Sequence, residues 1–129
     1  MARVVYLIDG FNLYHALDYC TAPHTIDPFK YRKYKWLNLR ALAELYAANV
    51  EGDTVEDVYY FTAFASWSSE KVSRHQIYIN ALQDMDVKVV LGEFKSKTKR
   101  CNSCKANFVT HEEKQTDVNI AVTLFRLAV

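Results

Sequence analysis

Residues Arg3 to Ile8 form a nearly continuous apolar run that is rich in β-branched side chains. Such a run is typical of a strand that is covered on both faces, as strands of parallel sheets are. Asp9-Gly10 ends the run, and Phe11 to Tyr19 is predicted to form a short helix. In parallel sheets, ligands bind at the carboxyl ends of the strands, where the chain turns into the next helix. The sequence therefore predicts that Asp9 lies at the functional site.

The rest of the chain repeats this alternation of strands and helices. Periodic apolar residues predict one helix between a cap at Asn38 and a stop at Glu51-Gly52-Asp53, and another that begins at Ser68 or Ser69. Strands are predicted at 55–65 and 87–94, and a last helix at 115–128. The order β-α-α-β-α-β-loop-α favours an α/β fold whose parallel sheet carries helices on both faces. We expect a single domain over residues 1–129, with a basic, CxxC-bearing loop at about 95–112.

No strand is predicted after the last helix, and its apolar sequence continues from Leu124 to Val129. We therefore expect the fold to be incomplete at its C-terminal end. Exposed sheet edges and apolar patches associate with one another, so we also expect a homo-oligomer.

The composition excludes several classes of protein. Half of the 129 residues are apolar, which is enough to bury a core. The apolar runs are too short to cross a bilayer, and the first residues lack the layout of a secretion signal. Three cysteines suit a reduced compartment better than a disulfide framework, which favours a cytoplasmic protein that does not bind membranes. Because the formal net charge is only +1, any attraction to nucleic acid must come from local basic segments.

The first segment with the residues for chemistry is Ile8-Asp9-Gly10-Phe11-Asn12-Leu13-Tyr14. A carboxylate directly after a buried strand is costly unless a cation or hydrogen-bond donors lie nearby. Asn12 is placed to orient Asp9 or to hold a metal-bound water. The alternative interpretation is that Asp9 merely caps the helix that follows it.

The second segment is residues 112–119, Glu-Glu-Lys-Gln-Thr-Asp-Val-Asn. It holds Glu112, Glu113 and Asp117, and Asp117 lies in the first turn of the last predicted helix, where an anion is favoured. The alternative interpretation is a solvated helix start with no further role.

The two segments together resemble the NYN-domain proteins, the LabA-like branch of the PIN-like nuclease superfamily. The resemblance rests on Ile-Asp-Gly-Phe-Asn-Leu-Tyr at 8–14 followed by Glu-Lys-Gln-Thr-Asp-Val-Asn-Ile-Ala at 113–121, and it covers most of the chain. It implies a Rossmann-like (PIN-like) sheet whose acidic residues gather around Mg²⁺ or Mn²⁺ to hydrolyse RNA. By position, it implies that Asp9 and Asp117 bind the metal and that Asn12 supports Asp9 in catalysis. It also makes Glu113 a candidate ligand and Lys114 a candidate phosphate contact.

The chemistry implied by the resemblance has a physical basis. Two carboxylates about 4 Å apart repel by roughly 4 kcal/mol at an effective dielectric near 20, and a divalent cation removes that penalty. A bound metal also makes hydroxide available for attack on phosphorus. NYN proteins usually continue into a strand with a Ser-Gly-Asp-Ser-Asp-like turn that supplies further acids, and this sequence ends before it. We expect a metal-dependent ribonuclease for single-stranded RNA; the alternative is a non-catalytic RNA-binding or protein-interaction module with the same fold.

A third segment, Cys101-Asn102-Ser103-Cys104, has metal-ligand spacing. Two thiolates at this spacing can bind one tetrahedral Zn²⁺, and His111 is a candidate third ligand. The alternatives are a redox pair or two ordinary reduced thiols. The redox alternative is disfavoured because the motif does not follow a first strand and open a helix, as thioredoxin-type motifs do. The fourth zinc ligand would come from Cys20, His15, His24, His75, water or a second chain.

Two further segments concentrate positive charge. Cations alternate with aromatic rings between Phe29 and Trp36, and no acid lies between Lys95 and Lys105. Cations bind phosphates and aromatic faces stack on unpaired bases, so these segments suit a single strand of RNA. The alternative is a solvated surface. The candidate substrate-binding residues are Lys30, Tyr31, Arg32, Lys33, Lys35, Lys97, Lys99, Arg100 and Lys114.

Overall fold

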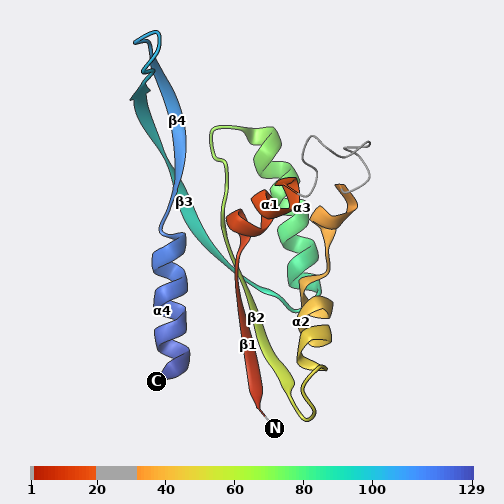
Figure 1. Cartoon of the computed structure of the whole chain (residues 1–129). Helices are drawn as coiled ribbons and strands as arrows, with labels where there is room; N and C mark the ends of the chain where they lie inside the picture. Colours follow the sequence, from red (N-terminus) through yellow and green to blue (C-terminus); the bar gives the residue numbers. More distant parts are fainter. Residues whose placement is uncertain (1, 20–31) are drawn as a thin grey trace.

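The computed structural model describes residues 2–19 and 32–129, which form a mixed α/β fold around a four-stranded open sheet (Figure 1). The elements are, in chain order, β1 (Arg3–Asp9), α1 (Gly10–Tyr19), the 3-10 helix η1 (Arg32–Trp36), α2 (Leu39–Ala47), β2 (Thr54–Ala63), α3 (Ser69–Asp84), β3 (Lys88–Arg100), β4 (Asn107–Lys114) and α4 (Thr116–Ala128).

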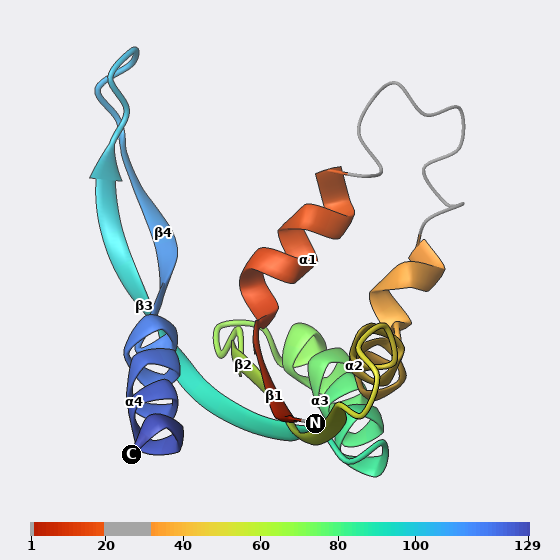
Figure 2. The same cartoon turned by 60° about the horizontal axis from the view of Figure 1, so that its bottom comes forward.

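The sheet has the strand order β1-β2-β3-β4. β1 pairs parallel with β2, β2 pairs parallel with β3, and β4 pairs antiparallel with β3. The helices α1, α2 and α3 lie on one side of the three parallel strands and α4 lies on the other (Figure 2). The predicted α/β class and the parallel pairing of the first three strands are therefore confirmed.

The helix starts follow from side-chain caps. The side chain of Asn38 accepts a hydrogen bond from the backbone N–H of Ala41 at 3.0 Å and caps α2. Ser68 accepts one from the backbone N–H of Lys71 at 3.4 Å and caps α3. Each cap satisfies a backbone donor that has no partner within the helix. Both predicted caps are thus confirmed, with Ser68 rather than Ser69 at the start of α3.

The core lies between the sheet and the first three helices. Val58 and Tyr60 of β2 form a buried cluster with Leu39 and Ala43 of α2 and Leu82 of α3. Because neighbouring residues of a strand point to opposite faces, Tyr59 and Phe61 of β2 point to the side of the sheet on which α4 lies. The removal of these apolar side chains from water is the main term that stabilises this layer.

The long ribbon formed by β3 and β4 corrects one prediction. A loop was expected at 95–112, but β3 continues to Arg100 and pairs with β4 in a hairpin that extends away from the helices (Figure 1). The pairing runs from Glu93 with Lys114 to Arg100 with Asn107, and only the tip around the two cysteines is a turn. In an antiparallel ladder every second pair exchanges two backbone hydrogen bonds, and these bonds join the two strands of the ribbon.

The side of α4 that packs against the sheet is not the side on which its apolar residues are aligned. Val118, Val122 and Phe125 are exposed, with Phe125 at 72% of its full surface. The more buried positions are Thr116, Asn119, Ile120 and Thr123, which follow the i, i+3, i+4, i+7 pattern. The side-chain amide of Asn119 donates to the carbonyl oxygen of Leu91 in β3 at 3.4 Å, which fixes this stripe against the sheet.

Candidate functional site

The turn from β1 into α1 determines where the Asp9 side chain lies. Gly10 is buried, and a Cβ at this position would overlap the ring of Tyr60 and lie 2.8 Å from the carbonyl oxygen of Phe61. Only glycine leaves room for α1 to begin directly against β2. The Asp-Gly pair is therefore required by packing, and it fixes Asp9 at the last position of β1.

Asp9 accepts two hydrogen bonds from Asn12. Its Oδ1 accepts the backbone N–H of Asn12 at 3.1 Å, and its Oδ2 accepts the side-chain amide at 3.0 Å. The first bond is a helix cap, because it satisfies the N–H three residues into α1. An ionised carboxylate has about four lone-pair positions, so two bonds leave Asp9 able to accept further partners. The predicted support of Asp9 by Asn12 thus coexists with the capping role.

The sheet register indicates the face on which Asp9 lies. Asp9 pairs with Phe61 of β2, and Phe61 pairs with Val90 of β3. Residues that are paired across strands point to the same face. Tyr60 belongs to the cluster under α1 to α3, so its neighbour Phe61 points to the α4 side, where it is fully buried. Asp9 shares that side.

Asp117 lies in the first turn of α4, at the same end of the sheet. Asp9, Phe61 and Val90 are paired across the three parallel strands. Asn119, two residues after Asp117, donates a hydrogen bond to Leu91, which follows Val90 along β3. The helix then runs back along the sheet and contacts β1, β2 and β3 (Figure 1). The structure therefore brings the elements that carry the two predicted carboxylates to one end and one face of the sheet.

Carboxylate oxygens are the type of ligand that magnesium and manganese ions prefer. Mg²⁺ is usually held by one or two carboxylates and keeps several of its waters. Asp117 is exposed and Asp9 is half-buried, so both oxygen pairs are reached from solvent. Within residues 2–19 and 32–129, no three His, Cys, Asp or Glu side chains gather in a group that could hold a metal ion.

The predicted substrate-binding residues fall into separate groups. Lys30 and Tyr31 lie outside the described residues. Arg32 and Lys33 belong to η1 and Lys114 ends β4, and for these three only the backbone is described, as for Glu113. The Nζ atom of Lys35 lies 4.3 Å from the centre of the Tyr14 ring on α1, at cation–π distance.

The β3–β4 ribbon separates the remaining basic residues onto two faces. Alternation along β3 places Lys97 and Lys99 on one face and Arg100 on the other. The Nζ atoms of Lys97 and Lys99 lie 3.7 and 3.4 Å from Oε1 of Glu112. Arg100 instead donates from Nε to the carbonyl oxygen of Lys105 at the tip. The basic segment is thus a two-stranded ribbon with one lysine-rich face rather than a basic loop.

The CxxC motif forms the hairpin tip. The backbone N–H of Cys101 donates to the carbonyl oxygen of Ala106 at 2.8 Å, and the N–H of Lys105 donates to the carbonyl oxygen of Cys101 at 2.9 Å. Lys105 adopts a left-handed backbone with φ 60°, which closes the turn. The backbone N–H groups of Cys104 and Ser103, with the Cys104 side chain, hold the pKa of the Cys101 thiol below its usual range. Both thiols are free, and Cys104 is exposed.

His111 does not join the two cysteines, which corrects the predicted zinc ligand set. It pairs with Ser96, four positions along β4 from Asn107. At roughly 3.4 Å per residue, this places His111 about 14 Å from the last pair of the ribbon. Its ring stacks on Trp67 instead, with 3.6 Å between the ring centres and 4° between the planes.

Several aromatic residues near Asp9 were not predicted to be functional. Phe11 on α1, Trp67 after β2 and Phe94 on β3 come from three separate segments of the sequence, and the fold brings them together. No local pattern links them, because each segment contributes a single ring. The sequence indicates a place near the site only for Phe11, because Phe11 lies two positions after Asp9.

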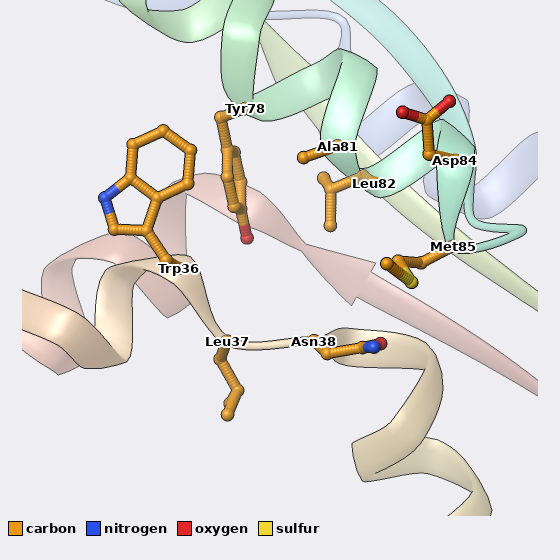
Figure 3. Close-up of a pocket in the computed structure, with 8 residues that line it drawn as sticks. All are labelled: Trp36, Leu37, Asn38, Tyr78, Ala81, Leu82, Asp84 and Met85. Carbon is orange, nitrogen blue, oxygen red and sulfur yellow. The ribbon is translucent and has the colours of Figure 1, made fainter.

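A pocket of about 210 Å³ lies elsewhere, between the start of α2 and the end of α3 (Figure 3). Figure 3 shows Trp36, Leu37 and Asn38 on one side and residues of α3 on the other. Burial raises the pKa of Tyr78, which lines the pocket, to about 12. None of the predicted site residues in the described part of the chain lines this pocket.

Comparison with protein-family models, with characterised proteins and with solved structures gave no match. Among the helices of residues 2–19 and 32–129, none has the length and apolar character needed to cross a membrane.

Proposed function

We propose that this chain is a metal-dependent ribonuclease that cleaves single-stranded RNA. Asp9 and Asp117 hold a divalent cation, and Asn12 positions Asp9. The observation that carries the proposal is the position of Asp9, fixed by two bonds at the carboxyl end of β1, on the face where α4 begins. In sheets with parallel strands, that end is where ligands bind.

Each residue has a defined task in this mechanism. Asp9 and Asp117 supply negative charge and hard oxygen atoms, which Mg²⁺ and Mn²⁺ prefer. Asn12 keeps the Asp9 carboxylate in one orientation through its amide. When bound, the cation supplies hydroxide at neutral pH and neutralises charge that develops on the phosphate. The lysines of the ribbon bind the RNA backbone, and no protein nucleophile is needed.

A non-catalytic RNA-binding module is the second candidate. Two observations favour it: in the described part of the chain no three potential ligands group together, and the segment from Lys95 to Lys105 carries five cations and no acid. Cations bind phosphates without any need for a catalytic metal.

We further propose that the hairpin tip binds Zn²⁺ through Cys101 and Cys104. Two thiolates in a tight turn are a typical half of a tetrahedral zinc site, and N–H groups that point at a cysteine sulfur stabilise its ionised form. The other two zinc ligands come from groups other than Cys101 and Cys104. This site is separate from the one at Asp9, because it lies at the far end of the ribbon (Figure 1).

The ribonuclease proposal is tested with labelled single-stranded RNA, the purified chain, and Mg²⁺, Mn²⁺ or EDTA. Asp9→Asn and Asp117→Asn are each expected to reduce cleavage to the level seen with EDTA. Asp84→Asn is the matched control, because Asp84 is an exposed carboxylate at the end of α3. Cleavage that persists in both site variants would reject the assigned residues. RNA binding that needs no metal, with no cleavage under any condition, would favour the second candidate.

A further inference from the structure

Five rings from four segments form a continuous string beside Asp9. Trp67 stacks on His111, with ring centres 3.6 Å apart, and meets Phe94 edge to face at 5.0 Å. Phe94 contacts Phe11 at 6.2 Å, and Phe11 contacts His15 at 4.3 Å. The string therefore runs without a break from the base of the β3–β4 ribbon to α1.

Three rings of the string, those of Phe11, His15 and Trp67, belong to exposed residues, whereas Phe94 and His111 are partly buried. Phe11 is 41% exposed and Trp67 is 43% exposed. Tyr14, which contacts the ring of His15 at 5.7 Å, is 49% exposed. Phe11, Trp67 and Tyr14 therefore keep surface that the contacts within the protein do not cover, and this surface is available to an additional flat partner.

The string also joins the two elements that carry the proposed metal ligands. Phe11 lies two residues after Asp9, in the first turn of α1. Phe94 and His111 lie on the ribbon that leads into α4, which carries Asp117. A chain of nucleotides that reached the carboxylates would therefore pass over the rings.

Positive charge flanks the string at both ends. Lys35 lies over the ring of Tyr14 near α1. At the other end, the segment from Lys95 to Lys105 carries five cations and no acid. Of these, Arg100 shares the ribbon face of Phe94, whereas Lys97 and Lys99 lie on the opposite face beside Glu112. Phosphates need such cations, while bases need flat apolar faces, so the combination suits a strand whose bases are unpaired. A duplex hides its base faces and gains nothing from the rings.

We propose that Trp67, Phe94 and Phe11 form a stacking surface for the unpaired bases of single-stranded RNA, with Phe94 between the other two rings. The assignment rests on the proposed function, since it names the part of the site that holds the substrate. It differs from the alternative in which the rings only attach the ribbon to the body, because that alternative predicts no contact between Trp67 and RNA.

Fluorescence tests the contact directly, because the chain has only two tryptophans. Trp36→Phe leaves Trp67 as the only indole, and Trp67→Phe leaves Trp36, which packs on Tyr78 outside the string. Both variants carry Asp9→Asn and are titrated with a 12-nucleotide oligouridylate in EDTA, so no cleavage occurs. Quenching of Trp67 is expected whether or not Trp36 is also quenched, because Trp36 belongs to the other segment that is predicted to bind RNA. Absence of Trp67 quenching while the RNA binds would overturn the proposal.

Affinity measurements separate stacking from attachment of the ribbon. Trp67→Ala and Phe11→Ala are each expected to weaken oligouridylate binding by about fivefold or more, and to leave binding of duplex RNA unchanged. Trp67→Phe, which keeps a ring, is expected to restore most of the affinity, and Tyr46→Ala, which removes an exposed ring of α2 outside the string, is the control. A lower melting temperature of Trp67→Ala with unchanged affinity would overturn the proposal. Quenching and selective binding without metal-dependent cleavage would support the stacking surface while rejecting the nuclease activity, so the two failures are distinguishable.

Discussion

Asn12 engages both carboxylate oxygens of Asp9, one through its backbone N–H at 3.1 Å and the other through its side-chain amide at 3.0 Å. The first bond belongs to the start of α1, and any residue except proline at position 12 would provide it. The second bond depends on the amide. Capping and orientation of Asp9 are therefore two separable functions of one residue pair.

Asn12→Ala is expected to separate these functions. The variant keeps the backbone N–H that caps α1 but loses the amide that orients Oδ2, so its melting temperature should change little. Residues that orient a metal ligand typically contribute about 10- to 100-fold to metal affinity or activity. We expect a loss of that size in Mn²⁺-dependent cleavage, measured as initial rates over a range of Mn²⁺ concentrations. Asn80→Ala on the exposed side of α3 is the control, and an unchanged Mn²⁺ dependence in Asn12→Ala would exclude the role given to Asn12.

Gly10→Ala is expected to destabilise the fold. The new methyl group would overlap the Tyr60 ring and crowd the carbonyl oxygen of Phe61, so α1 would have to move away from β2. Overpacking of this kind costs about 1–3 kcal/mol of the free energy of unfolding. Urea unfolding measures the change, with Ser73→Ala on the exposed surface of α3 as the control. Equal stability of Gly10→Ala and the unmodified chain would show that α1 tolerates a shift here.

The sequence predicted the parts of the fold that depend on local signals. The apolar run of β1, the turn at Asp9-Gly10 and the caps at Asn38 and Ser68 act within a few residues, so they are visible in the sequence. The same holds for the position of Asp9 at a strand end, which follows from the rule for parallel sheets. These signals required no knowledge of distant contacts.

The β3–β4 ribbon could not be predicted in this way. From Lys95 to Arg100 the sequence alternates cations with small polar residues, so neither face shows the apolar period of a half-buried strand. What stabilises the ribbon is its pairing with 107–114, a contact that no local pattern shows. The stacking of His111 on Trp67 and the exposure of the apolar side of α4 could not be predicted for the same reason. Both depend on which helices and strands pack against each other, and these contacts join residues that are distant in the sequence.

His75 is expected to make stability depend on pH. Burial lowers the pKa of His75 from its ordinary value of 6.5, and its Nε2 lies 3.3 Å from Oγ1 of Thr62. The unfolded chain therefore binds a proton more readily than the folded chain. Stability from the neutral ring is present above pH 6.5 and falls as the pH decreases from 6.5 towards the pKa of the folded state. The melting temperature should decrease between pH 7.5 and pH 5 by more in the unmodified chain than in His75→Gln. The same decrease in both would assign it to other groups.

The hairpin tip is expected to retain zinc through its two cysteines without a contribution from His111. After dialysis, the chain should contain Zn²⁺, and its X-ray absorption should show Zn–S distances of about 2.3 Å. Cys101→Ser and Cys104→Ser should each lose the metal. His111→Ala should keep it, since His111 is stacked on Trp67 and lies along the ribbon from the tip. Loss of zinc in His111→Ala, or no zinc in the unmodified chain, would contradict the assignment.

The lysine-rich face of the ribbon is expected to set the salt dependence of RNA binding. Lys97 and Lys99 share a single carboxylate, Glu112, at 3.7 and 3.4 Å, so the pair keeps an excess of positive charge. Each phosphate contact that is lost should reduce the slope of log K against log salt by about 0.7 for a single strand. Lys97→Gln and Lys99→Gln should each show this reduction in anisotropy titrations over a range of NaCl concentrations, whereas Lys71→Gln on α3 should not. Glu112→Gln should tighten binding at low salt, because it removes the acid between the two lysines. Unchanged slopes in both ribbon variants would place the RNA backbone on another surface.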